Sequence, residues 1–171
     1  MRKKIKMLTH AAVIAAVYVI LTHLQNFMLP GTTTMAIQFR LSEALCVLAF
    51  FTPAAISGLG LGCFLFNLTS GSALPVDFLV GTAASTLSAW AMWGCRNVTV
   101  KGFPLLGLLM PAIFNALLVG WELYAYTGVS FWVNALYVFI GEAAVTLTLG
   151  SGLYYLLKKE NLYKRILRPE P

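Results

Sequence analysis

Four acidic residues and one arginine lie inside or at the edge of strongly apolar stretches of this chain: Glu43, Asp77, Glu122, Glu142 and Arg40. On insertion scales, a charged side chain at the centre of a membrane-spanning helix costs about 2.5–3.5 kcal/mol. Ionisable residues at such positions therefore indicate a binding or transport site. Because carboxylates accept hydrogen bonds and attract cations, the expected chemistry is recognition of a donor-rich or positively charged ligand.

The composition indicates an integral membrane protein. Of 171 residues, 59% are hydrophobic and 11% are charged, whereas a soluble domain carries roughly 25% charged residues. The net charge of +6 comes from basic residues near both termini and in one internal loop, which is typical of the flanks of membrane spans. No nucleic-acid partner is therefore expected. The cysteines and histidines show no metal-ligand spacing, so no metal site is expected either.

The apolar stretches predict an all-α, polytopic membrane protein in which residues 1–171 form one membrane domain, a bundle of six transmembrane helices. A helical span needs about 20 mostly apolar residues, and Gly, Pro and polar clusters separate the candidates. The predicted spans cover roughly residues 7–29, 41–51, 54–67, 75–93, 103–124 and 131–157. Pro75 suits the first turn of the fourth helix. The second and third spans are short and interrupted, a feature of binding segments in transporters.

The basic residues also predict the orientation of the chain in the cell membrane. Six spans place both termini on one side, and the basic clusters at residues 2–6 and 158–168 mark that side as cytoplasmic. The loop that contains Arg96 and Lys101 falls on the same side. One alternative is a cleaved N-terminal signal peptide, which leaves five spans, but residues 22–26 offer no small-x-small cleavage site.

This topology brings the ionisable residues to the outer half and centre of the membrane. Arg40 and Glu43, three residues apart, share a face at the outer start of the second span. Asp77 opens the fourth span, and Glu122 ends the fifth, both on the outer side. Glu142 lies about 16 Å into the sixth span at 1.5 Å per residue. We therefore predict a polar cavity that is open to the outside and closed toward the cytoplasm.

Simpler roles also fit some of these residues. Asp77 and Glu122 lie near the predicted membrane surface, where they fit ordinary headgroup anchors. Arg40 and Glu43 fit a structural ion pair. Glu142 fits a simple role least well, because a carboxylate in the middle of a span needs a partner.

Four carboxylates and one guanidinium predict a site that rejects anions. A guanine-like ring offers a carboxylate two parallel hydrogen bonds, from a ring N–H and an exocyclic amino group. Asn67 ends the third span at the outer face and Asn115 shares a helical stripe with Glu122, so both join the predicted site. Aromatic residues near the outer ends of the fifth and sixth spans fit either stacking on a flat ligand or the interfacial belt of membrane proteins: Trp121, Tyr124, Tyr126, Phe131, Trp132 and Tyr137.

Several motifs together resemble one known family. Residues 38–45 read QFRLSEAL, residues 50–55 read FFTPAA, and residues 114–123 read FNALLVGWEL. Asp77 begins a DFLVG segment, and Glu142 lies in a GEA segment. Over nearly the whole chain, these motifs resemble the QueT family of queuosine-precursor transporters. Its members are substrate-binding S components of energy-coupling factor (ECF) transporters.

The resemblance implies a ligand and partners. The ligand would be a 7-deazaguanine, such as queuine or its aminomethyl precursor. Glu122 and Glu142 are the candidates for reading the guanine-like edge, Glu43 and Asp77 for pairing with a ligand ammonium, and Arg40 for orienting Glu43. The partners would be a transmembrane coupling subunit and two cytoplasmic ATPases. This chain has no Gly-x-x-x-x-Gly-Lys-Ser/Thr loop, so ATP would be used by the partners, and we expect no cofactor and no enzymatic activity in the chain itself.

The resemblance also implies a docking face on the first span. S components resemble one another in an Ala-x-x-x-Ala face that contacts the coupling subunit. Two pairs fit this spacing, Ala11 with Ala15 and Ala12 with Ala16. Small residues four apart allow helices to approach closely in lipid, so packing within the chain explains the same spacing equally well.

Three other functions fit parts of this pattern. An S component for a different vitamin would share the fold and differ in its ligand. A stand-alone secondary transporter or channel coupled to protons or cations would also use intramembrane carboxylates. An intramembrane enzyme fits least, because the chain lacks a metal spacing, a Gly-x-Ser-x-Gly elbow and a convincing catalytic dyad.

Overall fold

The computed structural model describes residues 2–32, 39–71, 76–159 and 162–166. Within these ranges the chain is helical apart from turns and one isolated β-bridge, between Val100 and Phe103. The predicted all-α class is therefore confirmed. The elements are α1 (Arg2–Met28), the 3₁₀ helix η1 (Leu41–Phe50), α2 (Ala54–Thr69), α3 (Asp77–Gly94), α4 (Leu105–Thr127), α5 (Phe131–Val145), the π-helical turn η2 (Thr146–Gly150), α6 (Ser151–Lys159) and α7 (Leu162–Ile166).

The helices begin close to the predicted positions. Predicted starts at residues 41, 54 and 131 agree with η1, α2 and α5. The first helix begins earlier than predicted, at Arg2, because the basic residues before Met7 continue it as an exposed flank. Pro75, the predicted start of the fourth helix, lies outside the described residues, and α3 begins at Asp77. The last span extends to Lys159 through α5, η2 and α6.

The predicted count of six spans is not confirmed. Among the described residues, three helices are long and apolar enough to cross a membrane: Lys3–Met28, Leu105–Thr127 and Phe131–Lys159. Helices η1 and α2 are apolar but shorter. Ten residues of 3₁₀ helix extend only about 20 Å, which is less than the roughly 30 Å of a hydrocarbon core. On length alone, η1 is too short to cross a bilayer.

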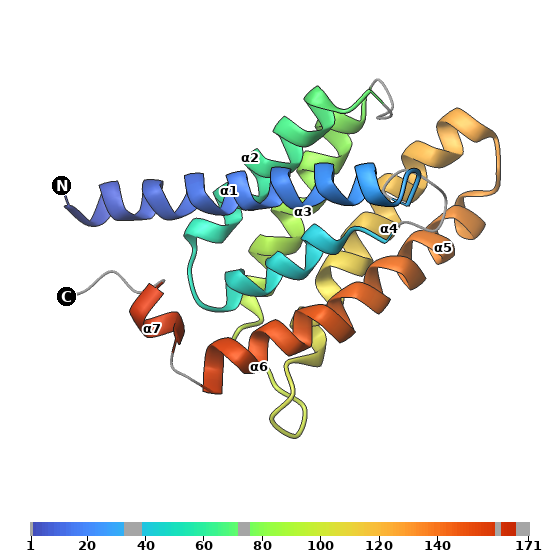
Figure 1. Cartoon of the computed structure of the whole chain (residues 1–171). Helices are drawn as coiled ribbons and strands as arrows, with labels where there is room; N and C mark the ends of the chain where they lie inside the picture. Colours follow the sequence, from blue (N-terminus) through green and yellow to red (C-terminus); the bar gives the residue numbers. More distant parts are fainter. Residues whose placement is uncertain (1, 33–38, 72–75, 160–161, 167–171) are drawn as a thin grey trace.

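Helix η1 instead forms the centre of the bundle. It contacts α1, α2, α3, α4, α5, η2 and α6, and in Figure 1 its cyan ribbon lies between α1 and the long helix formed by α5 and α6. With three residues per turn, side chains three apart share one face, which groups Glu43, Cys46 and Ala49. All three side chains are buried. The apolar segment that the sequence predicted to be a span is therefore an internal core helix.

Helices α1 and α2 pack through small residues. A Cβ atom built on Gly58 would lie 2.8 Å from the carbonyl oxygen of Ala11, and one built on Gly62 would lie 3.1 Å from the carbonyl oxygen of Ala15. Both alanines are buried, with exposures of 7% and 3%. Glycine is required at this crossing because the two backbones approach too closely for a side chain.

This contact separates the two predicted docking pairs. Ala11 and Ala15 face α2 inside the molecule. Ala12 and Ala16 lie about 100° further around α1 and are exposed. Of the two pairs, only the second therefore presents a surface on which another protein can pack.

Gly58→Ala is expected to destabilise the protein by about 1–3 kcal/mol. Its methyl group meets the Ala11 carbonyl oxygen at 2.8 Å and the Ile14 Cβ atom at 2.9 Å, and neither atom is the far end of a flexible side chain. The matched control is Gly152→Ala in α6, where an added Cβ meets nothing within 4 Å. That change should be neutral or favourable by roughly 0.5–1 kcal/mol, because alanine loses less entropy than glycine in a helix. Thermal unfolding of the purified protein in detergent measures both. Equal unfolding midpoints for the two variants would contradict the close α1–α2 contact.

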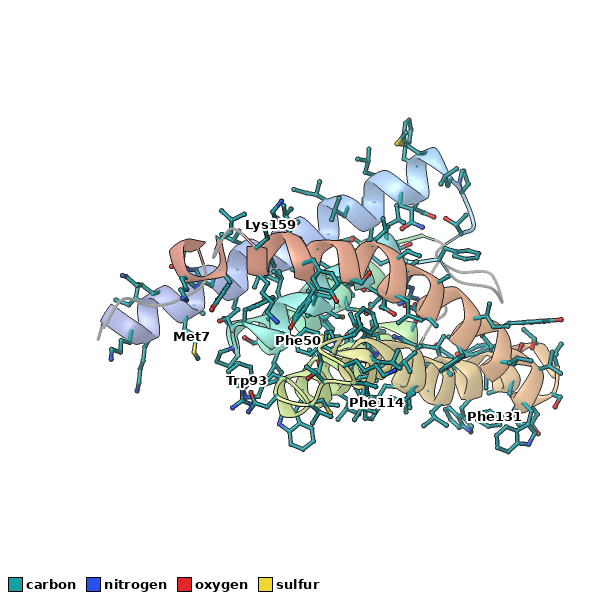
Figure 2. The ribbon with its side chains drawn as sticks, turned by 90° about the horizontal axis from the view of Figure 1, so that it is seen from below. Met7, Phe50, Trp93, Phe114, Phe131 and Lys159 are labelled. Carbon is teal, nitrogen blue, oxygen red and sulfur yellow. The ribbon has the colours of Figure 1, made fainter. Side chains whose placement is uncertain are left out.

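The start of α1 and the end of α6 lie at the same end of the bundle, which we call the basic end (Figure 1). Its described basic residues are exposed and include Lys3, Lys4 and Lys158. Figure 2 shows Met7, Phe50, Trp93 and Lys159 toward this end and Phe131 at the other. The surface of this end is therefore positively charged, because the described acidic residues are buried inside the bundle.

Candidate functional site

All seven predicted site residues are buried. Their relative exposures lie between 0% and 5%, for Arg40, Glu43, Asn67, Asp77, Asn115, Glu122 and Glu142. They come from η1 and the residue before it, the end of α2, the start of α3, α4 and α5. Burial of Asp77 and Glu122 contradicts the alternative that these two are headgroup anchors, because such anchors point out of the bundle.

The ionisable residues form one cluster around Arg40. Its Nη2 atom lies 3.8 Å from Oδ1 of Asp77. Arg40 also lies within electrostatic range of Glu122 and of Glu142, and Asp77 and Glu43 act on those two carboxylates in turn. The predicted convergence of charges from separate spans is therefore present in the structure.

The ion pair differs from the one expected, because Arg40 pairs with Asp77 and not with Glu43. The reason is that protein donors already surround the Glu43 carboxylate. The Tyr18 hydroxyl donates to Oε1 over 2.7 Å, the Ser85 hydroxyl donates to Oε1 over 3.1 Å, and the Cys46 thiol donates to Oε2 over 3.0 Å. Glu43 thus ties α1, η1 and α3 together. Its expected contact to a ligand ammonium stays a prediction.

Unlike the Glu43 carboxylate, four other side chains of the cluster have acceptor oxygens without a donor among the described residues. Both carboxylate oxygens of Glu122 and both of Glu142 are buried and have no hydrogen-bond partner among the described residues. The same is true of the side-chain oxygens of Asn67 and Asn115. A buried polar group without a partner costs about 1–3 kcal/mol, and more if it is charged. Such a set of acceptors is suited to a ligand that brings several hydrogen-bond donors.

The two asparagines hold local structure through their nitrogens. Asn67 Nδ2 donates to the carbonyl oxygen of Asp77 over 2.9 Å, which joins the end of α2 to the start of α3. Asn115 Nδ2 donates to the carbonyl oxygen of Pro111 over 3.0 Å. A Cβ atom on Gly81 would lie 2.7 Å from Asn67 Nδ2. Gly81 therefore leaves the space that the Asn67 amide occupies. Because these bonds use the nitrogens, the amide oxygens of Asn67 and Asn115 are left for other donors.

A sequence model of the QueT transporter family matches residues 8–159. The chain belongs to this family. Membership confirms the resemblance found in the sequence motifs, and it makes the chain a transport protein that works in a membrane. Searches of curated proteins and of solved structures found no match.

In this QueT family member, the cluster includes three polar residues of α1 that the sequence motifs did not identify. Tyr18, Thr22 and Gln25 of α1 are buried. The Thr22 hydroxyl donates to the Tyr18 carbonyl oxygen and is hydrogen-bonded to the Ser42 hydroxyl, both over 2.7 Å. Gln25 Oε1 accepts from the Leu41 N–H over 2.8 Å. Their spacing of four and three residues puts the three polar groups on one helical stripe. That spacing alone predicts that this face of the first helix packs against polar residues of the bundle.

The predicted aromatic group does not line the cluster. Five of its members have exposures between 40% and 75%: Trp121, Tyr124, Tyr126, Trp132 and Tyr137. This favours the interfacial belt over ligand stacking for these residues. The charged side chains of the cluster are buried, and the predicted opening toward the outside stays a prediction, because residues 33–38 and 72–75 lie outside the described part of the chain. In this QueT chain the candidate site is a buried polar cluster.

Proposed function

We propose that the chain is the substrate-binding S component of an ECF-type transporter that takes up a queuosine precursor. The observation that carries the proposal is a set of buried acceptors that have no hydrogen-bond partner among the described residues, on Glu122, Glu142, Asn67 and Asn115. Such a set calls for a ligand with many donors. A 7-deazaguanine has a ring N–H next to an exocyclic amino group, and its aminomethyl form adds an ammonium.

The arrangement of the carboxylates supports a division of work between them. A carboxylate that accepts two parallel N–H bonds recognises a guanine-like edge, and a second carboxylate nearby neutralises an ammonium. Glu122 and Glu142 have the free oxygens for these two roles. Glu43 is held by three protein donors, and Asp77 is paired with Arg40. In the proposal these two shape the site and balance its charge.

The proposed mechanism is capture followed by delivery. The chain binds its ligand from outside the cell and then docks onto a transmembrane coupling subunit, while two cytoplasmic ATPases supply the energy. The proposal places the basic end, with the start of α1 and the end of α6, in the cytoplasm, because lysines flank the spans there. The chain itself performs no catalysis and carries no cofactor.

The proposal is tested by calorimetry with the purified chain. Queuine and aminomethyl-7-deazaguanine should bind, whereas thiamin, riboflavin and biotin should not. Binding of one of those vitamins alone would replace the deazaguanine assignment with that of another S component. Liposomes distinguish the mechanism: the chain alone should not accumulate ligand, and addition of a coupling subunit, ATPases and ATP should start uptake. Uptake driven by an ion gradient in the chain alone would contradict the S-component assignment.

Ala12→Trp and Ala16→Trp are expected to abolish docking to the coupling subunit while leaving ligand affinity unchanged. Both positions are exposed on α1, and a bulky ring prevents the close helix approach that small residues permit. Co-purification with the tagged coupling subunit measures docking, and calorimetry measures ligand binding. The control is Ala144→Trp, an exposed alanine on α5. Equal co-purification of all three variants would remove α1 from the docking surface.

A further inference from the structure

A polar cavity lies at the basic end of the bundle, away from the carboxylate cluster. Its volume is about 430 Å³, and its walls come from the ends of η1 and α3 together with α6 and α7. Figure 2 shows Phe50 and Trp93, two residues of its lining, at this end of the molecule. The cavity is independent of the proposed ligand site, because it shares no residue with it.

One wall of this cavity is a stack of aromatic rings. The ring of Phe51 lies 5.6 Å from that of Tyr154 and 4.9 Å from that of Tyr163, with interplanar angles of 28° and 30°. Phe50 packs edge-on against Tyr154 at 5.3 Å. Such interlocked rings hold the wall in place, so the polar groups at its edge are carried by a well-packed support.

Two cations stand at the edge of this wall. The Arg96 guanidinium lies 4.1 Å from the centre of the Trp93 ring and donates one N–H to the Trp93 carbonyl oxygen over 2.8 Å. The Lys158 ammonium lies 5.4 Å from the centre of the Tyr154 ring and 3.4 Å from its hydroxyl oxygen. Both side chains line the cavity. Their heads are therefore positioned by aromatic rings and still have donors available, since a guanidinium has five N–H groups.

No carboxylate pairs with either cation among the described residues, where the recorded ion pair is that of Arg40 with Asp77. The four described acidic residues belong to the other cluster. The remaining two, Glu160 and Glu170, lie outside the described residues. The described lining of the cavity is thus cationic, which favours an anion that can accept several hydrogen bonds.

The same lysine borders an apolar surface. Lys158 also lines a neighbouring groove together with Tyr155, Leu156 and Lys159. Tyr155 and Leu156 are exposed, at 48% and 55%, and they belong to the candidate span Phe131–Lys159. A cavity lined by two cations and an apolar groove therefore meet at one residue, at the end of a candidate membrane span. A ligand that fits both has a charged head and an apolar chain.

We propose that this cavity binds the phosphate headgroup of an anionic phospholipid. Arg96 and Lys158 contact the phosphate, for which a guanidinium offers paired N–H donors and an ammonium offers a compact charge. One acyl chain follows the groove along Tyr155 and Leu156. Basic residues close to the membrane surface attract anionic lipids in this way. The lipid would hold α3, α6 and α7 together at the basic end.

The proposal is tested on the full chain, purified in detergent and depleted of lipid. Phosphatidylglycerol is titrated, and native mass spectrometry counts the bound lipid. The double variant Arg96→Gln/Lys158→Gln should bind phosphatidylglycerol about tenfold or more weakly, as expected when hydrogen bonds to charged groups are lost. The charge-matched control is Lys4→Gln/Lys101→Gln, which removes two exposed positive charges at the same end without touching the cavity. Unfolding midpoints without lipid check that both variants fold.

Four other results would overturn the proposal of a bound anionic phospholipid. Equal loss in both double variants would overturn the site, because it would show diffuse attraction to the basic end. Equal affinity for phosphatidylcholine would overturn the choice of an anionic lipid. If glycerol 1-phosphate, which has the phosphate without chains, competes at equal concentration, the site takes a soluble phosphate and the lipid assignment fails. Unchanged binding in Arg96→Gln/Lys158→Gln would also overturn the proposal and leave the cavity to a segment of a partner protein.

Discussion

Glu142→Gln is expected to weaken 7-deazaguanine binding at least about tenfold, because a hydrogen bond to a charged group contributes roughly 1.5–3 kcal/mol and each 1.4 kcal/mol is tenfold. The stability of the protein should not fall. Both oxygens of Glu142 are fully buried and make no hydrogen bond with a described residue, so the substitution breaks no such bond. Calorimetry measures the affinity, and thermal unfolding in detergent measures the stability.

The companion variant and the control make this result specific. Glu122→Gln should behave in the same way, because its oxygens are also buried and have no hydrogen-bond partner in the part of the chain that the structure describes. Thr148→Ala is the control, since Thr148 is exposed and lies on the same long helix beyond Glu142; its ligand affinity should match that of the unmodified chain. Unchanged affinity in both glutamine variants would remove the carboxylate cluster from the proposed binding site.

Glu43→Ala is expected to have the opposite profile, with a large loss of stability of several kcal/mol. The change leaves the hydroxyls of Tyr18 and Ser85 buried without their acceptor, at about 1–3 kcal/mol each. It also opens a cavity between α1, η1 and α3, which adds to the cost. Chemical or thermal unfolding in detergent measures the loss.

Glu43→Gln is the matched control for this prediction. The amide oxygen still accepts from Tyr18 and Ser85, so most of the stability should be retained. If Glu43→Gln instead abolished ligand binding without changing the unfolding midpoint, Glu43 would be a ligand residue, as expected from the sequence, and not the structural tie between three helices. Measuring affinity and stability on the same samples therefore separates the two roles.

Composition and spacing in the sequence were sufficient for the helical class, the membrane setting and the charged members of the polar cluster. A carboxylate in an apolar helix is costly anywhere in a bilayer, so Glu122 and Glu142 stand out without knowledge of their neighbours. The family followed from motifs around Arg40 and Asn115, and the family model confirms it. These features depend on residue type and local order, which the sequence contains in full.

Which side chains from different helices contact each other was determined only by the tertiary structure. The apolar residues 41–50 have the composition of a membrane span, and only the surrounding helices define them as a 3₁₀ helix in the core. Arg40 and Glu43 are neighbours along the chain, but the donors of α1 and α3 occupy Glu43 and leave Arg40 to Asp77.

The exposure of the two docking pairs on α1 also depends on the tertiary structure. Ala11 and Ala12 have the same side chain and adjacent positions, yet contact with Gly58 buries the first and leaves the second exposed. The sequence alone determined which residues carry charge, which are small and which segments are apolar. The tertiary structure decided which of them meet, because the rotation of each helix about its axis is set by packing against all its neighbours at once.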